Sequence, residues 1–135
     1  MTEIAVGILR DNEKILLCQR KKGGRYGLKW EFPGGKLERE ESTEHCVRRE
    51  LYEELSIEIH SIEHIHTEAA YYEDGGIFNV AYCFISGFTG EPQNNVFEQI
   101  RWVTLDELQY MDVLDGNKSF ITYLMNQRNK KIESR

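Results

Sequence analysis

The segment that most constrains the fold of this chain is a glycine-rich turn followed by an amphipathic helix. Pro33-Gly34-Gly35 is a strong signal for the end of a strand, because proline lacks a backbone donor and glycine favours turns. Ser42 is a good N-cap, and the spacing of apolar residues beyond it predicts a helix over 42–55. One side of this helix is apolar, with residues four positions apart: Val47, Leu51 and Leu55. Such a helix needs another layer to pack on, and we expect a β-sheet.

Three glutamates of the same helix adjoin the apolar side. Glu50, Glu53 and Glu54 fall at positions i, i+3 and i+4, so their carboxylates point from one side of the helix. An arbitrary trio of this kind is most often a solvated acidic surface, in which each pair of like charges costs about 0.2–0.5 kcal/mol. Here the carboxylates border the packed face, and the glycine turn can bring backbone oxygens to the same place. Grouped hard oxygens are what Mg²⁺ or Mn²⁺ requires, so the pattern indicates a divalent metal site.

The rest of the sequence predicts a mixed α+β domain. Apolar runs over 4–9 and 14–20 flank turn residues and predict a β-hairpin, after which 21–29 reads as an exposed basic loop. Thr104 and Glu107 form a capping-box pattern that starts a short helix. No repeat or linker interrupts the chain, so residues 1–135 are expected to form one domain. The remaining elements are strands over 30–32, 57–72, 77–88 and 99–103, and a final helix over about 116–126.

Composition narrows the classes of function. A formal net charge of −6 disfavours a nucleic-acid polymer as the partner and suits a small phosphorylated ligand, held through metal ions or local cations. No stretch approaches the ~18 apolar residues of a membrane span, so no membrane partner is expected. The cysteines are odd in number and have apolar neighbours, which favours reduced, buried thiols in a cytoplasmic protein. They are Cys18, Cys46 and Cys83.

The region from Gly35 to Ile57 resembles the Nudix box, a loop–helix–loop motif. Five residues separate Gly35 from Glu41, and seven more lead to Arg49-Glu50-Leu51-Tyr52-Glu53-Glu54-Leu55-Ser56-Ile57. The one departure is Ser56, because the family usually has glycine there, which suits a left-handed helix end. Serine in that geometry costs roughly 1 kcal/mol. The change affects the end of the helix and not a metal ligand.

Likeness to the MutT branch of the family covers nearly the whole chain. It is carried by Ile4-Ala5-Val6-Gly7-Ile8, by Gln19-Arg20 and by Lys29-Trp30-Glu31-Phe32-Pro33-Gly34-Gly35-Lys36. The resemblance implies the Nudix α/β/α sandwich, in which a mixed sheet lies between the box helix and C-terminal helices. It also implies a Mg²⁺ site, with Mn²⁺ as a substitute. The implied ligands are a carbonyl of Gly34 or Gly35 and the carboxylates of Glu50, Glu53 and Glu54.

The resemblance gives supporting roles to charged residues near this metal site. Arg49 would hold the preceding loop and orient a glutamate by a charge-assisted hydrogen bond, and Glu41 would fix the loop. The general base stays open, because family members use either a glutamate of the box or one that precedes a late strand. The two candidates are Glu53 and Glu98. The third alternative is a metal-activated water that reacts without either of them.

Three further residues are candidates for binding the substrate. Arg20 matches the family's phosphate-contacting arginine, and an exposed surface arginine is the alternative. Phe32 is expected in the core at the edge of its strand, with lining of the base pocket as the alternative. Asn117 lies where MutT-like enzymes have an asparagine that reads an oxidised guanine, and its amide can donate and accept at once. Asp115-Gly116-Asn117 is also ordinary turn and N-cap chemistry, and the sequence favours the cap.

These features predict a Mg²⁺-dependent enzyme that hydrolyses a phosphoanhydride bond of a (deoxy)nucleoside triphosphate. The expected products are a nucleoside monophosphate and pyrophosphate, and oxidised nucleotides are among the candidate substrates. One alternative is hydrolysis of another nucleoside diphosphate-linked compound, such as a nucleotide sugar or a dinucleotide. A second is a module that senses nucleotides without cleaving them, which the complete set of glutamates disfavours. A monomer or a homodimer is expected.

Overall fold

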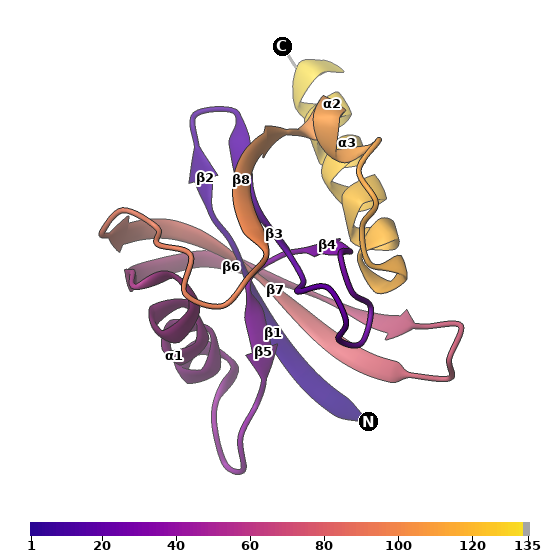
Figure 1. Cartoon of the computed structure of the whole chain (residues 1–135). Helices are drawn as coiled ribbons and strands as arrows, with labels where there is room; N and C mark the ends of the chain where they lie inside the picture. Colours follow the sequence, from indigo (N-terminus) through magenta and orange to yellow (C-terminus); the bar gives the residue numbers. More distant parts are fainter. Residues whose placement is uncertain (134–135) are drawn as a thin grey trace.

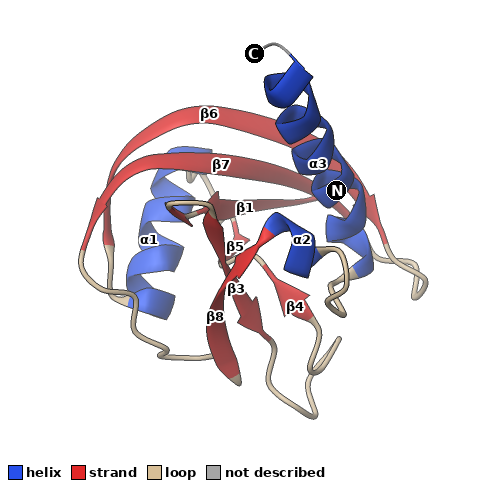
Figure 2. Ribbon diagram, turned by 90° about the horizontal axis from the view of Figure 1, so that it is seen from above, coloured by secondary structure: helices blue, strands red, loops and turns tan. Residues whose placement is uncertain are grey.

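The computed structural model describes residues 1–133 and contains two four-stranded sheets with helices on both sides (Figures 1 and 2). The first sheet has the order β5-β1-β7-β6 and is mixed, because β1 and β7 run parallel and the other pairs antiparallel. In the second sheet β3 pairs antiparallel with β2, β4 and β8. The strands are β1 Thr2–Ile8, β2 Arg10–Asp11, β3 Lys14–Gln19, β4 Trp30–Glu31, β5 Gly34–Lys36, β6 Glu58–Tyr71, β7 Ile77–Thr89 and β8 Gln99–Thr104.

The predicted hairpin between 4–9 and 14–20 is wrong for most of its length. β1 pairs with β7 and β5 in the first sheet, and only the short β2 pairs with β3 as a hairpin. The chain crosses between the sheets at Leu9, whose carbonyl accepts a hydrogen bond from the Leu16 amide at 3.2 Å. Burial explains the difference: the second half of β1 is buried on both faces, as is typical of a central strand, whereas a hairpin edge would leave one face in water.

Successive residues of β1 face two separate apolar cores. Ala5 packs with the apolar side of α1 (Thr43–Leu55), whose predicted stripe is fully buried. Val6 and Ile8 face the opposite core, which contains Phe120 of α3 (Lys118–Glu133). Figure 2 shows α1 and α3 on opposite sides of the curved strands. The predicted α/β/α layers are therefore present, although two sheets form the middle layer. The three cysteines are free and buried, as expected.

Helix α1 begins and ends as its sequence predicts. The Ser42 hydroxyl accepts a hydrogen bond from the His45 amide at 3.1 Å, and the helix starts at Thr43. Ser56 ends it in the left-handed conformation, with φ 58° and ψ 36°. The Ser56 hydroxyl accepts a hydrogen bond from the Asn95 side chain at 2.9 Å, so the segment before β8 covers this helix end. Serine keeps the geometry that glycine would have adopted, and it gains a polar contact.

The other elements agree with the expected positions, apart from their ends. The capping box of Thr104 and Glu107 is present and starts α2 (Leu105–Leu108). A 3₁₀ turn, η1 (Asp115–Asn117), leads into α3, which begins later and runs further than the predicted helix over 116–126. Strand β5 was not predicted, because its glycines read as a turn. Within residues 1–133, none of the helices is both long enough and apolar enough to span a membrane.

Candidate active site

The glycine turn contacts α1 at the edge of the first sheet. The Gly34 amide donates a hydrogen bond to Oε1 of Glu54 at 3.0 Å. A Cβ atom at Gly34 would lie 2.1 Å from the carbonyl oxygen of Ala5, and one at Gly35 would lie 2.5 Å from Cδ of Glu50. Any larger residue would therefore push the turn away from β1 and from α1. The two glycines let the backbone approach the carboxylates directly.

Glu50 and Glu54 lie together beneath this turn. Burial raises the pKa of Glu54 to about 9, and the negative charges of Glu50 and Glu31 together with a hydrogen bond to Glu50 act in the same direction. Two half-buried carboxyl groups in contact repel each other unless a proton or a cation lies between them. A pair of hard oxygen donors on one helix suits Mg²⁺ or Mn²⁺. The donor set therefore fits the predicted metal.

Glu53 does not join this pair in the structure. Its side chain is 55% exposed, and its carboxylate lies 3.5 Å from Nη1 of Arg49. Among residues 1–133, no three His, Cys, Asp or Glu side chains are grouped closely enough to hold an ion together. An exposed glutamate can change rotamer at little cost, so Glu53 could approach an ion held by the other two. Its role as a ligand stays a prediction.

Arg49 connects the loop before α1 to the glutamate pair. Nε and Nη2 donate to the two oxygens of Glu41 at 2.7 and 2.9 Å, and Nη1 donates to Glu50 at 2.9 Å. Hydrogen bonds from Arg49 and from the Glu38 amide hold the pKa of Glu41 well below its usual range, although its side chain is only 4% exposed. The bidentate contact fixes the plane of the guanidinium, which in turn orients Glu50. These are the contacts expected of a pair that fixes the loop, and their part in catalysis stays a prediction.

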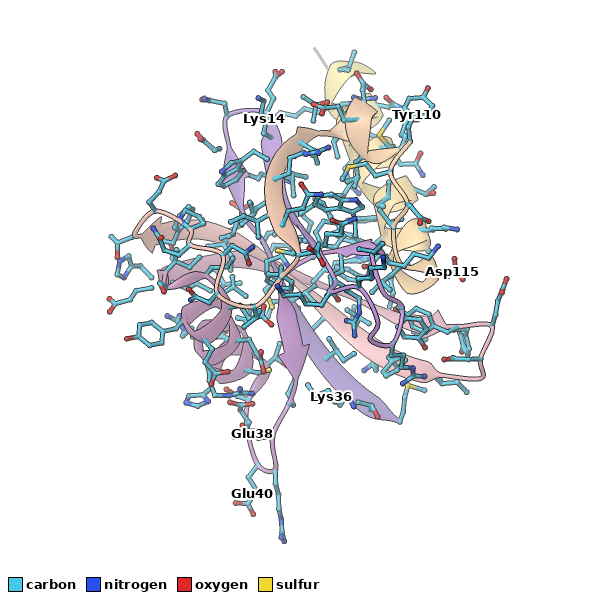
Figure 3. All side chains as sticks on the ribbon, in the orientation of Figure 1. Lys14, Lys36, Glu38, Glu40, Tyr110 and Asp115 are labelled. Atoms are coloured by element: carbon cyan, nitrogen blue, oxygen red, sulfur yellow. The ribbon has the colours of Figure 1, made fainter. Side chains whose placement is uncertain are left out.

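The loop between β5 and α1 places its other carboxylates away from this pair. Figure 3 shows Glu40 at the tip of the loop, pointing out from the rest of the molecule. Glu38 lies on the same loop, 69% exposed, and 3.6 Å from Arg49. The acidic residues of the loop therefore divide into Glu41, whose side chain is buried and anchors the loop, and the exposed Glu38 and Glu40.

A cleft of about 410 Å³ opens beside the glutamate pair. Both signs of charge line it, since Glu54 and Glu31 are present together with four cationic side chains. A polyphosphate with a divalent cation has the complementary distribution of charge. The cleft is thus a local concentration of positive charge on a chain with a formal net charge of −6. The cationic residues are Arg20, Lys21, Arg25 and Lys36.

Arg20 lies in the cleft wall, already paired with protein atoms. Its Nη1 donates to both carboxylate oxygens of Glu31 at 3.1 Å, and its Nε donates to the Arg25 carbonyl at 2.9 Å. Burial raises the pKa of Glu31, and the charge of Arg20 opposes that shift. Arg20 is therefore part of an ordered ion pair at the cleft and not a free surface arginine. Its contact with a phosphate stays a prediction.

Phe32 lies in the core, as predicted, and it also lines the cleft. Its ring meets those of Tyr82 and Phe120 edge-on at 6.0 and 5.5 Å. Because rings on both sides fix its orientation, Phe32 offers a rigid apolar surface on the inner wall. Such a surface can support a nucleotide base, although contact with one has still to be tested.

The N-cap interpretation of Asn117 is wrong. Asn117 is only 5% exposed, and its Nδ2 donates to the Tyr82 hydroxyl at 2.9 Å. Its Oδ1 accepts no hydrogen bond from the residues that the structure describes, so it does not cap α3. The reason is that η1 runs directly into α3, which turns the side chain inward. A buried acceptor without a donor costs about 1–3 kcal/mol, which is a reason to look for a donor on a ligand.

The two candidates for the general base are both exposed. Glu98 is exposed, and its Oε1 accepts a hydrogen bond from the Lys22 amide at 3.3 Å. Val96 and Phe97, just before it, do line the cleft. Neither Glu53 nor Glu98 is among the residues of 1–133 that line the cleft. The choice between them therefore stays a prediction.

Sequence reasoning missed several residues of the cleft wall. Lys21 and Arg25 come from the loop that read as exposed, and Lys36 directly follows the glycine turn. Glu31 faces the cleft because β4 alternates, with Trp30 turned into the core. The one feature of the sequence that could have indicated these residues is the high density of cationic side chains just before the glycine turn. A single sequence does not show that this loop folds back over the turn.

The chain is similar to known proteins over most of its length. The family model described as NUDIX domain matches residues 1–124. A CTP pyrophosphohydrolase of Escherichia coli K12 is 33% identical over 111 residues, which cover 82% of each chain. An 8-oxo-dGTP diphosphatase of the same organism is 31% identical over 123 residues, or 90% of this chain and 95% of the relative.

Solved structures with the same fold cover nearly the whole chain as well. The ORF135 protein of E. coli superposes with a TM-score of 0.83 at 27% identity, covering 95% of this chain and 91% of the other. A MutT structure from work on Aliivibrio salmonicida and Vibrio cholerae has a TM-score of 0.78 at 26% identity, with coverages of 93% and 98%.

Proposed function

This chain belongs to the NUDIX domain family and is a Nudix hydrolase, and we propose that it cleaves a (deoxy)nucleoside triphosphate in a Mg²⁺-dependent reaction. The products would be a nucleoside monophosphate and pyrophosphate. The observation that carries the proposal is the half-buried pair of Glu50 and Glu54, of which Glu54 lines a cleft with four cations. Carboxylates suit a divalent ion, and the cations of the cleft suit the phosphates that the ion would leave uncovered.

The residues of the cleft divide the work of such a reaction. When bound, Mg²⁺ supplies Lewis-acid chemistry, which withdraws charge from phosphoryl oxygens and makes a water easier to deprotonate. Glu50 and Glu54 would hold the ion, with Glu50 oriented by Arg49 and Glu54 oriented by the Gly34 amide. Arg20 and its neighbouring cations position the phosphates for in-line attack. Glu53 or Glu98 accepts the proton of the attacking water.

Asn117 supports an oxidised purine as the first candidate base. Its Nδ2 is bound to Tyr82, which leaves Oδ1 as a buried acceptor without a donor among residues 1–133. An 8-oxo-purine carries an additional N–H on its five-membered ring, which could donate to that oxygen. Tyr82 packs against Phe32 of the cleft wall, so the amide lies one side chain behind the cleft. A cytosine nucleotide is the second candidate, because one relative is named as a CTP pyrophosphohydrolase.

The test is release of pyrophosphate and phosphate, with Mg²⁺, from a panel of compounds. The panel contains normal and 8-oxo nucleoside triphosphates, nucleotide sugars and dinucleotides, with the Glu54→Gln variant as the control for contaminating activity. The proposal expects pyrophosphate from one triphosphate at a clearly superior kcat/KM. Turnover of a nucleotide sugar or dinucleotide alone would retain the metal site and reject the substrate class. Tight nucleotide binding without any turnover would make the chain a sensor.

A further inference from the structure

The loop over 21–29 is fastened to a distant part of the chain by one carboxylate. Arg25 donates to Oδ2 of Asp74 through Nε at 3.2 Å and through Nη2 at 2.9 Å, and the Tyr26 hydroxyl donates to the same oxygen at 2.7 Å. Asp74 lies in the turn between β6 and β7, where its Oδ1 accepts the Gly76 amide at 3.0 Å. These hydrogen bonds hold the pKa of Asp74 at about 2, so it is charged throughout the neutral range. We call this group of contacts the Asp74 clasp.

Aromatic packing strengthens the same junction. The ring of Tyr26 stacks on that of Tyr72, with centroids 4.9 Å apart, and the Arg25 guanidinium lies 4.7 Å from the centre of the Tyr26 ring. Tyr72 itself packs edge-on against Phe78 of β7. The carboxylate therefore joins a small stack of side chains in which each member restricts the next.

The backbone of the loop adopts conformations that need support. Tyr26 and Leu28 have φ values of 57° and 65°, in the left-handed region of backbone conformation that residues other than glycine and asparagine rarely adopt. Gly23 also has a positive φ, and Gly24 and Gly27 add freedom on either side of Arg25. Such a segment keeps one shape only when surrounding contacts impose it. The clasp supplies those contacts at the residue where they are needed, Tyr26.

The loop is also a wall of the candidate active site. Lys21, Gly24 and Arg25 line the cleft, whereas Asp74 is not among the lining residues of the described chain. The Arg25 carbonyl accepts a hydrogen bond from Arg20, so a shift of Arg25 would reach the Arg20–Glu31 pair. Asp74 is therefore placed to act on the cleft from outside, through Arg25.

We propose that Asp74 is a positioning residue that holds loop 21–29, and with it Arg25, as the wall of the cleft that receives the triphosphate. The inference rests on the proposed function, because the wall is assigned to nucleotide binding. Without the clasp, the loop must be ordered each time a nucleotide binds, and that ordering weakens binding. Among the glutamates of α1, Glu54 lines the cleft, and it is held by the Gly34 amide and not by the loop, so we expect the effect to fall mainly on KM.

The first experiment is a comparison of Asp74→Asn with a matched control. The control is Asp112→Asn, which removes the same charge from an exposed carboxylate that pairs with the same loop. Asp112 lies 2.6 Å from the Lys29 ammonium, and Lys29 is not among the residues of 1–133 that line the cleft. We expect Asp74→Asn to raise KM about tenfold, with kcat within about twofold of wild type. Tyr26→Phe, which loses one hydrogen bond and keeps the stack, should show a smaller rise. Asp112→Asn should resemble wild type.

The second experiment does not depend on turnover. Limited proteolysis with trypsin reports how often the loop opens. The trypsin sites in the loop are Lys21, Lys22, Arg25 and Lys29. Cleavage within the loop should be about tenfold faster in Asp74→Asn than in Asp112→Asn, at equal thermal stability. Equal cleavage rates, or an unchanged or lower KM, would overturn the inference. If no substrate in the panel is cleaved, the proposed function fails, and proteolysis still decides whether the clasp holds the loop.

Discussion

Glu50 and Glu54 lie together beneath the glycine turn, and Glu54 also lines the cleft. The three glutamates of α1 differ in their surroundings: Glu54 faces the cleft, Glu50 is held by Arg49, and Glu53 is exposed. Sequence spacing places all three on one side of the helix but does not distinguish them. That distinction comes from the glycine turn, which covers two of the glutamates and leaves the third in water.

Replacing the glutamates of the site one at a time should distinguish the metal ligands from the general base. Glu54→Gln and Glu50→Gln should each lower kcat about 10²–10⁴-fold, because each removes a charged donor to the ion while the side chain keeps its size. Glu53→Gln and Glu98→Gln distinguish the two candidate bases, since only the variant that lacks the base should flatten the acidic limb of the pH–rate profile. Steady-state kinetics with circular dichroism as the folding control provide the measurement. Full activity in both Glu53→Gln and Glu54→Gln would reject the metal-site assignment.

Metal-free protein should lose stability as pH rises. The pKa of Glu54 is raised in the folded state, so the unfolded chain releases this proton at lower pH and folded stability falls between the ordinary glutamate value of 4.5 and about 9. Thermal unfolding in EDTA should show this decline, and Glu54→Gln should flatten it and raise Tm at pH 8 by roughly 2–6 °C. If the thermal stability of wild type and variant depended equally on pH, the raised pKa of Glu54 would be contradicted.

At the scale of elements, the sequence predicted the features of α1 that depend on neighbouring residues, but not the pairing of strands that are distant in the sequence. Its start, end and apolar side were predictable because they depend on local chemistry: a hydroxyl cap, a left-handed terminal residue and a period of four. Pairing of β1 was not predictable, because its partner in β7 lies over seventy positions away and adjacent apolar runs favour a hairpin. Strand β5 was missed for a related reason: its glycines read as a turn, and they form a strand here because they pair closely with β1.

Ser56 allows a direct test at the end of α1. Ser56→Gly relieves the left-handed strain but loses the hydrogen bond from Asn95, so stability should stay within about 0.5 kcal/mol of wild type. Ser56→Ala keeps the strain and loses the hydrogen bond, and it should destabilise the protein by about 1 kcal/mol. Urea unfolding measures both values. A larger gain in Ser56→Gly would mean that the Asn95 contact contributes little.

At the scale of the whole molecule, the site is assembled from segments that the sequence keeps apart. The box helix and glycine turn were predictable as a metal-binding unit, because they are contiguous and carry a specific motif. The cationic wall was not, since it depends on loop 21–29 folding toward the turn at 72–76. Asn117 was misread because a turn pattern does not reveal whether a side chain faces water or the core.

Binding of Mg²⁺ should stabilise the whole fold. An ion that binds only the folded state adds about 2.7 kcal/mol at one hundred times its Kd, which corresponds to a rise in Tm of roughly 5–15 °C. Differential scanning calorimetry with MgCl₂ and with EDTA should show this shift in wild type, and Glu54→Gln should lose most of it. The Asp112→Asn variant should shift as wild type does. An equal shift in Glu54→Gln would place the ion elsewhere.

The position of β1 at the centre of a sheet also bears on how the protein is made. Thr2 pairs with Phe78, so a ribosome that adds about 5–20 residues per second leaves the strand without its parallel partner for roughly 4–15 seconds. During that interval both of its apolar faces are open to chaperones and to other nascent chains. Slower translation between residues 9 and 77 should therefore lower the soluble yield, whereas a pause late enough for β7 to have left the ribosome should not.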